Sequence, residues 1–151
     1  MRSSPELARQ RFSAARVARL ATVSAAGEPH LVPVTFALLG AADQGGTSDA
    51  DVIVFAVDHK PKSTTALRRL DNIAANPRVA FLVDFYDDDW DRLWWVRADA
   101  TAAVLHGPLR HSAIIALQSK YRQYGEIPPA GVVVGSSIVN WSSWQAALTG
   151  D

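Results

Sequence analysis

Alternating and continuous runs of hydrophobic residues along the chain predict mostly β-strands. Residues 18–24 alternate between apolar and polar side chains, and a short turn containing Gly27 separates them from a second β-prone run at 29–38. The two runs are therefore expected to form a hairpin. Pro33 removes one backbone donor from the second strand, which places that strand at a sheet edge or a bulge. Residues 52–57 are apolar throughout, as in a buried strand.

Three further strands and three helices complete the predicted elements. The strands are expected over 78–86, 93–105 and 131–141, and the helices over 4–17, 65–75 and 109–124, with a loop at 40–50. Ser4 and Pro5 are suited to the start of the first helix, whose arginines are expected to face solvent. Strands outnumber helices and do not alternate regularly with them, which excludes a doubly wound fold. The prediction is a mainly β (α+β) fold, a six-stranded antiparallel barrel with flanking helices.

The composition fits one globular domain over residues 1–151. Hydrophobic residues make up 48% and charged residues 20% of the chain, which argues against disorder. The 15 basic and 15 acidic side chains cancel, so no general electrostatic attraction to nucleic acid is expected. No apolar run is long enough to cross a membrane, and the N-terminus lacks the apolar core of a signal peptide. A cytoplasmic protein without nucleic-acid or membrane partners is expected.

No sequence motif identifies a nucleophile or a metal site. The chain has no cysteine and no Gly-x-Ser-x-Gly motif, and its four histidines stand apart from one another. The acidic segment 87–91 offers carboxylates to a hard cation, but a solvated turn is the favoured interpretation. The sequence therefore predicts no metal and leaves the catalytic residue unknown.

The segment Lys60-Pro61-Lys62-Ser63-Thr64-Thr65 is the most informative part of the sequence. It follows a predicted strand and precedes a helix, so free amides, hydroxyls and two ammonium groups come together. Such a set binds phosphate, although the glycines of a Walker loop are missing. The alternative is a polar connection with a helix cap. Arg68 and Arg69 either add charge to this site or lie on the surface.

Tryptophans form a second cluster of interest. Trp94 and Trp95 are adjacent on a predicted strand, so their side chains are expected on opposite faces, one in the core and one toward a partner or ligand. Arg97 lies close by, and aromatic residues and arginine are enriched at interfaces. Core packing alone is the alternative explanation for these tryptophans.

The order of several short motifs resembles a known family. Residues 27–34 (Gly-Glu-Pro-His-Leu-Val-Pro-Val), the strand ending in Lys60-Pro61-Lys62, and Asn76-Pro77-Arg78-Val79 are similar to the pyridoxamine 5'-phosphate oxidase-like split β-barrel proteins, known for FMN binding. Within that family, Lys-Pro-Lys with the Leu-Trp-Trp-Val-Arg run at 93–97 looks like the actinobacterial group of probable coenzyme F420-dependent enzymes. The similarity covers about residues 10–105.

The resemblance implies a homodimer with two cofactor sites at the subunit interface. The cofactor phosphate would be held by Lys60, Lys62, Ser63 and Thr64, and the tricyclic ring would lie near Val32, Pro33, Val34, Phe55 and Ala56, with Trp94 and Arg97 reaching in from the other subunit. His30 is a candidate near the ring, although a half-buried structural histidine is the favoured interpretation. The basic C-terminal substrate motif of pyridoxamine phosphate oxidases proper is absent, which argues against pyridoxal phosphate synthesis.

The resemblance further implies a coenzyme F420-dependent oxidoreductase. Reduced F420 would transfer a hydride to a small unsaturated organic substrate, while the protein supplies binding and orientation. The first alternative is an FMN-dependent oxidase or reductase. The second is a non-catalytic protein that binds F420, FMN or haem.

Overall fold

A single antiparallel sheet of seven strands dominates the computed structural model, which describes residues 1–46, 49–57 and 64–146, and only the backbone of 64–67. Its strands are β1 (Ala18–Val23), β2 (Pro29–Val34), β3 (Ala37–Leu39), β4 (Val52–Ala56), β5 (Arg78–Phe85), β6 (Trp94–Val104) and β7 (Val133–Gln145). They lie in the order β2-β1-β5-β6-β7-β4-β3. The predicted antiparallel split barrel with flanking helices is therefore confirmed, with seven strands instead of six.

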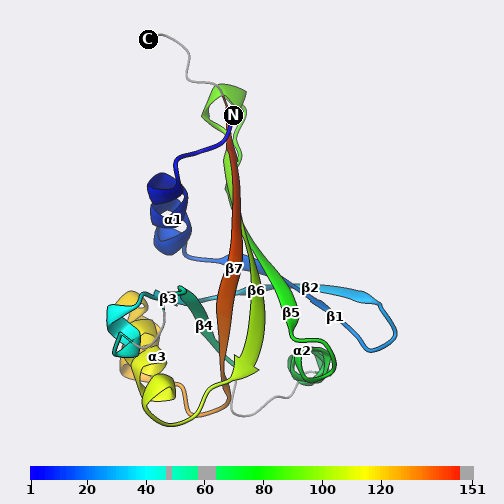
Figure 1. Ribbon diagram of the computed structural model, residues 1–151, viewed down its shortest axis with the longest axis vertical. Helices are drawn as coiled ribbons and strands as arrows, with labels where there is room; N and C mark the ends of the chain where they lie inside the picture. Colours follow the sequence, from blue (N-terminus) through cyan, green and yellow to red (C-terminus); the bar gives the residue numbers. More distant parts are fainter. Residues whose placement is uncertain (47–48, 58–63, 147–151) are drawn as a thin grey trace.

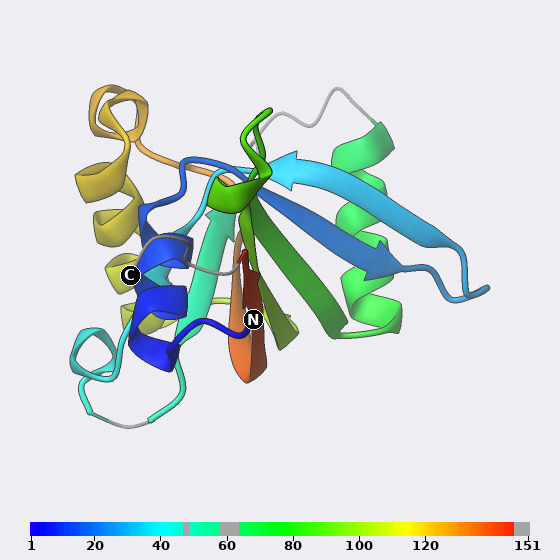
Figure 2. The same cartoon turned by 90° about the horizontal axis from the view of Figure 1, so that it is seen from above.

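The additional strand arises because the run predicted over 29–38 breaks at Thr35 and Phe36. The two resulting strands, β2 and β3, occupy opposite edges of the sheet although only two residues separate them. The sheet must therefore curl until its edges almost meet, as Figures 1 and 2 show. Pro33 lies in the edge strand β2, which confirms the position inferred from its missing donor.

Two tyrosines fix the crossing between the two sheet edges. The backbone N–H of Phe36 donates to the hydroxyl oxygen of Tyr121 at 3.1 Å, and the same hydroxyl lies 2.8 Å from the carbonyl oxygen of Arg16. The hydroxyl groups of Thr35 and Tyr124 are 2.9 Å apart. These side chains satisfy polar groups at the crossing, where the chain passes from one strand to the next.

Helices lie on two sides of the curled sheet. They are α1 (Pro5–Ala14), α2 (Thr64–Ala75), α3 (Gly107–Lys120) and α4 (Arg122–Glu126), with short 3₁₀ turns η1 (Ala42–Gln44) and η2 (Trp90–Arg92). α2 lies on one side, and α3 lies on the other beside α1 (Figure 2). The helix predicted over 109–124 is interrupted at Tyr121, whose backbone is extended, and the first helix ends at Ala14, three residues early.

The core divides into two clusters that share strand β4. Ile53 and Phe55 point into the curl of the sheet, whereas Val52 and Val54 pack toward α3. Phe12 of α1 joins the first cluster, where its ring contacts those of Phe36 and Trp141. β4 is therefore buried on both faces, as its continuous apolar run predicts.

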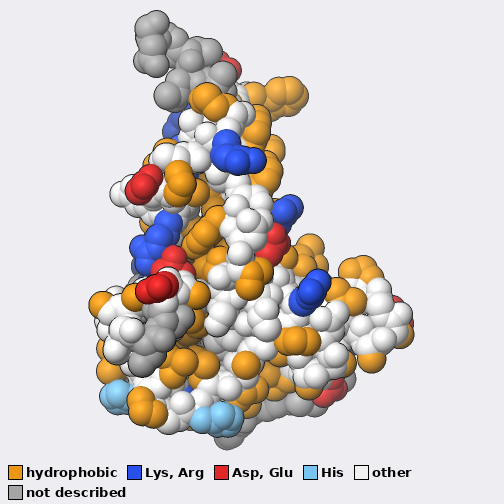
Figure 3. Space-filling model, in the orientation of Figure 1, with side chains coloured by type: hydrophobic (Ala, Val, Ile, Leu, Met, Phe, Trp, Pro, Cys, Tyr) orange, Lys and Arg blue, Asp and Glu red, His pale blue; other side chains and the backbone are white. Residues whose placement is uncertain are grey.

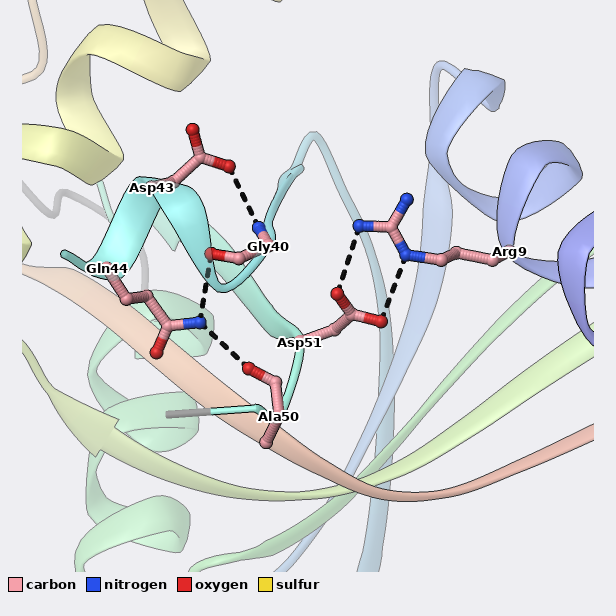
Figure 4. Close-up of polar contacts among 6 residues, drawn as sticks. All are labelled: Arg9, Gly40, Asp43, Gln44, Ala50 and Asp51. Atoms are coloured by element: carbon pink, nitrogen blue, oxygen red, sulfur yellow. Dashed lines mark hydrogen bonds and ion pairs between the residues drawn. The ribbon is translucent and has the colours of Figure 1, made fainter. Parts of the chain in front are cut away.

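The arginines of α1 were predicted to face solvent, and the structure shows that at least one of them also joins two elements. Arg9 donates two hydrogen bonds to the carboxylate of Asp51, each 3.0 Å long, and thereby ties α1 to the start of β4 (Figure 4). Nearby, the Gly40 N–H donates to Asp43, and the Gln44 amide donates to the carbonyl oxygens of Gly40 and Ala50. The segment predicted as a loop over 40–50 thus contains an ordered turn around η1.

Candidate functional site

The predicted phosphate-binding segment joins β4 to the N-terminus of α2. β4 ends at Ala56, and Thr64 is the first residue of α2, so a strand-to-helix connection is confirmed. Lys60, Lys62 and Ser63 lie outside the described residues, and so does the side chain of Thr64. Their proposed role therefore stays a prediction.

Arg69 lies about one and a half turns into α2, close in the chain to the predicted phosphate-binding segment. Its Nε is buried and finds no hydrogen-bond partner within the described part of the chain. Its guanidinium lies over the ring of Phe55, with Cζ 5.8 Å from the ring centroid. Burial lowers the pKa of Arg69. A buried guanidinium nitrogen without an acceptor is costly unless an anion supplies one, so this position favours an anionic ligand.

A hollow of about 410 Å³ lies where β4 ends. Ala56 lines it from the strand, and Tyr124, Ile127 and Pro129 line it from α4 and the segment that follows. Ile127 is 75% exposed, which is unusual for a large apolar side chain. Sequence reasoning brought Ala56 to the site but missed this opposite wall, because α4 is remote in the chain and carries no recognisable motif.

The other strand residues predicted beside the cofactor ring divide between two faces. Val32, Val34 and Phe55 are buried and belong to the core within the curl. Pro33 points outward from the edge strand β2. Val32, Val34 and Phe55 can therefore support a ligand only by holding the backbone of their strands rigid. Direct contacts with a ligand on the outer face would come from exposed neighbours such as Leu31.

Trp94 and Arg97 lie on opposite faces of β6. Trp94 packs against the core and stacks under Arg11, whose Cζ is 5.0 Å from the ring centroid. Trp95 shares the outer face with Arg97, so the predicted division of the two tryptophans is confirmed. The pairing of Arg97 with a tryptophan therefore involves Trp95.

A groove of about 520 Å³, called here the outer groove, lies on that outer face. Its lining is mainly apolar and includes Leu31, Leu82, Tyr86 and Trp95, with Arg19 and Arg97 among its charged residues. Hydrophobic side chains are visible between charged ones on the surface shown in Figure 3. Such an uncovered apolar face is typical of an interaction surface.

His30 lies at a third hollow, between the β1–β2 hairpin and α2. Arg68 and Asp71 line it from the helix. The Nδ1 atom of His30 is buried and has no hydrogen-bond partner among the described residues. Beneath the hollow, the buried side chain of Asn72 donates to the hydroxyl of Thr22 at 3.0 Å. The histidine is half-buried, as expected, and Arg68 is exposed.

The acidic segment caps its own backbone. Asp87 accepts from the N–H of Asp89, and Asp89 accepts from the N–H of Asp91, while Arg92 pairs with Asp87 at 3.3 Å. The described residues contain no group of three or more His, Cys, Asp or Glu side chains placed to hold a metal ion. Across the described ranges, every helix is too short or too polar to cross a bilayer.

Comparison with known structures supports the fold. A FAD-binding protein from Mesorhizobium loti is 20% identical, with a TM-score of 0.67 and 95% of each chain covered. A haem-binding protein from Mycobacterium smegmatis is 20% identical with a TM-score of 0.71, covering 99% of this chain and 57% of that one. A FAD-binding protein from the same organism is 14% identical with a TM-score of 0.64, covering 98% and 100%.

The comparison with protein-family models shows to which family the chain belongs. No curated protein matches it. The family model described as pyridoxamine 5'-phosphate oxidase matches residues 4–145, nearly the whole sequence. The curled antiparallel sheet and its flanking helices agree with that match. The chain therefore belongs to the pyridoxamine 5'-phosphate oxidase family.

Proposed function

We propose that the protein binds a phosphate-bearing tricyclic redox cofactor, coenzyme F420, and acts as an F420H2-dependent reductase of a small unsaturated organic substrate. When bound, reduced F420 supplies a hydride to an electrophilic carbon of the substrate. FMN is the alternative cofactor, because both molecules join a tricyclic ring to a phosphate-bearing tail. The resemblance of Lys60-Pro61-Lys62 and of residues 93–97 to F420-dependent proteins supports the first choice.

The observation that carries the proposal is the buried Nε atom of Arg69, which has no hydrogen-bond partner among the described residues. The buried Nε without a partner lies in the helix that directly follows the two lysines and two hydroxyl residues of the predicted phosphate segment. A phosphate or similar anion supplies the acceptor that Arg69 lacks. The residues present therefore fit the cofactor's charged tail.

Each part of the site has a proposed role. Lys60, Lys62, Ser63 and Thr64 hold the phosphate, and Arg69 adds charge from beneath. Val32, Val34 and Phe55 keep the neighbouring strands rigid. The hollow beside Ala56, with its apolar wall at Ile127 and Pro129, receives the substrate and excludes water from it.

We further propose a homodimer in which the outer groove forms part of the subunit interface. Leu31 and Tyr86, 67% and 62% exposed, would lose contact with water there. Arg97 and Trp95 lie in the same groove, so each subunit would present them to its partner. This arrangement suits the expectation that Arg97 reaches the cofactor site of the other subunit.

Binding measurements test the cofactor proposal. Purified apo-protein is titrated separately with F420 and with FMN, following cofactor fluorescence and the free ligand. We expect Lys62→Ala and Arg69→Ala each to lose about 1.5–3 kcal/mol of binding, roughly 10- to 150-fold in affinity, because a charge-assisted hydrogen bond is removed. Arg92→Ala serves as the control, because Arg92 is exposed and contacts Asp87 and the ring of Phe85, both outside the predicted phosphate segment. Equal F420 binding by the Lys62→Ala, Arg69→Ala and parent proteins would contradict this site.

Turnover separates the enzyme from the second candidate, a non-catalytic protein that binds F420, FMN or haem. That candidate is favoured by the similarity of the fold to a haem-binding protein. Reduced F420 is mixed with enones and nitro compounds, and its oxidation is followed with and without protein. Tight F420 binding without oxidation across the panel supports a carrier. A haem titration that develops a Soret band at stoichiometric haem, with weak F420 binding, supports haem binding.

A further inference from the structure

A separate groove of about 510 Å³ lies between α1, β3, η1 and α3. Its lining includes Ser13, Leu38, Ser112, Ile115, Ser119 and Lys120. It shares no lining residue with the outer groove or with the hollow beside Ala56. We call it the Lys120 groove, and its lining is separate from the proposed cofactor site.

Lys120 is a buried cation without an acceptor. Its Nζ atom is shielded from water and has no hydrogen-bond partner among the residues the structure describes. It lies 3.8 Å from the ring centroid of Phe36 and 5.3 Å from that of Tyr121. Cation–π contacts of this kind offset only part of the free energy that removing an ammonium group from water costs. The charge is therefore only partly compensated by the protein.

Other charged and titratable groups around Lys120 do not neutralise it. Arg16, in the connection between α1 and β1, adds a second positive charge, with its Cζ 5.2 Å from the centroid of the Tyr121 ring. The Tyr121 hydroxyl is engaged with the backbone, and burial raises its pKa, so it stays neutral. Asp43 enters the groove from η1, but its carboxylate accepts from the Gly40 N–H at 2.9 Å and forms no ion pair with Lys120. Burial and the charge of Arg16 lower the pKa of Lys120 to about 8.

The remaining lining defines the ligand's chemistry. The hydroxyls of Ser13, Ser112 and Ser119 offer hydrogen bonds, while Leu38 and the half-exposed Ile115 offer apolar contact. One ammonium group, with the carboxylate of Asp43 in the same groove, suits one negative charge better than two. We propose that the Lys120 groove binds a small monocarboxylate with a short apolar chain. The flexible Lys120 side chain turns from the ring of Phe36 toward the groove, and its ammonium group donates to the ligand's carboxylate.

The proposal has a pH signature that a structural lysine lacks. A bound carboxylate favours the ammonium form, so the ligand binds with proton uptake above the pKa of free Lys120, about 8. Between neutral pH and that pKa, where the ligand's carboxylate stays ionised, the affinity is nearly constant. It falls as the pH rises above the pKa of Lys120, by up to about tenfold per pH unit. An arginine at the same position stays charged throughout this range.

Calorimetric titration of the full chain with sodium butyrate tests the proposal, with butyramide as the uncharged control. We expect butyrate to bind at millimolar or lower concentration near neutral pH, to weaken above pH 8, and to exceed butyramide at least tenfold, about 1.4 kcal/mol. Lys120→Arg is expected to retain binding and lose the pH dependence, and Lys120→Met to lose binding. Ile115→Trp fills the groove from its half-exposed wall and is expected to block butyrate without disturbing the core.

Several outcomes overturn the proposal. They are no butyrate binding by the parent protein, equal binding of butyrate and butyramide, equal binding of butyrate to the parent and Lys120→Met, or undiminished binding to a folded Ile115→Trp. If Lys120→Met fails to fold, Lys120→Arg decides: a fall in its affinity above pH 8 equal to that of the parent assigns the titration to another group and overturns the role of Lys120. Circular dichroism of each variant shows whether it has folded.

Discussion

Some positively charged side chains of this protein form ion pairs, whereas others have a buried nitrogen without a hydrogen-bond acceptor among the described residues. Arg9 is explained by the carboxylate of Asp51, and Arg97 by that of Asp99 at 3.2 Å. Arg69 and Lys120 each have a buried nitrogen and no such partner within the described residues. The distinction matters because a buried charge is stable only when something completes it. It separates candidate ligand sites from arginines that simply tie elements together.

The hydroxyl of Tyr121 gives a direct test of the crossing between the sheet edges. It accepts from the Phe36 N–H and lies within hydrogen-bond distance of two carbonyl oxygens, those of Arg16 and Phe36. Tyr121→Phe leaves the buried Phe36 N–H without an acceptor, so we expect the free energy of unfolding to fall by about 1–3 kcal/mol. Urea unfolding followed by circular dichroism measures this change.

Tyr124→Phe is the matched control for that measurement. Its hydroxyl contacts the partly buried Thr35 hydroxyl, which water can reach once the tyrosine oxygen is removed. The expected loss is about 0.5–1.5 kcal/mol, the usual net value of one hydrogen bond. A Tyr121→Phe protein as stable as Tyr124→Phe would show that the crossing does not depend on the buried hydroxyl.

At the scale of elements, Gly135 lets β7 pass close to the segment before α3. A Cβ atom at Gly135 would lie 2.7–2.9 Å from three side-chain carbons of Leu105, which is buried in the cluster under α3. Gly135→Ala is therefore expected to destabilise the protein by about 1–3 kcal/mol through overpacking. Thermal or urea unfolding checks the value.

A double-mutant cycle shows whether the clash with Leu105 is the cause. Leu105→Ala removes buried apolar volume and is expected to cost about 2–5 kcal/mol by itself. The pair Gly135→Ala and Leu105→Ala should then cost less than the two changes added together, by about 0.5–3 kcal/mol. Strict additivity would place the strain elsewhere in β7.

The sequence predicts elements well where side-chain patterns or turn residues mark them. The buried run of β4, the hairpin of β1 and β2, and the opposite faces of Trp94 and Trp95 follow from periodicity alone. The breaks at Thr35 and at Tyr121 do not, because neither carries glycine or proline. Both depend on a long-range contact between α3 and the crossing, which no local pattern encodes.

The candidate site was predictable in part for the same reason. The strand-to-helix segment after β4 is contiguous in sequence, so its lysines and hydroxyls could be recognised together. The wall formed by Tyr124 and Ile127 comes from a different part of the chain, and only the fold brings it to Ala56. That the Arg69 Nε atom is buried without a partner among the described residues depends on the packing of α2, which the sequence pattern does not show.

At the scale of the whole molecule, the curled sheet covers its inner face and leaves part of its outer face open, because α3 packs on β3 and β4 but not on the outer groove. The inner face is closed by α1, α2 and the crossing, and it holds the main core. The outer face carries Leu31, Leu82 and Trp95, and no helix residue in the described part of the chain lines the outer groove. The strands β6 and β7 extend beyond the helices (Figure 1). A surface of this kind is costly to leave in water, which favours a second subunit over it.

Replacing Leu82 tests whether that surface joins two copies of the chain. Leu82 is 37% exposed and points outward from β5, so Leu82→Glu leaves the inner core unchanged but places a charge in the outer groove. If the groove is the interface, the symmetric arrangement brings this carboxylate into a desolvated contact in both subunits, at a cost of several kcal/mol. Sedimentation equilibrium should then show a dimer for the parent and a monomer, or a dimer weakened at least about tenfold, for Leu82→Glu.

Ile115→Glu, a similar change on the half-exposed face of α3, should leave the dimer intact. A monomeric parent, or a Leu82→Glu protein as dimeric as the parent, would contradict the proposed interface. Cofactor affinity measured on the same samples tells whether Arg97 acts across the interface, because dissociation should then weaken binding even though no cofactor-binding residue has changed.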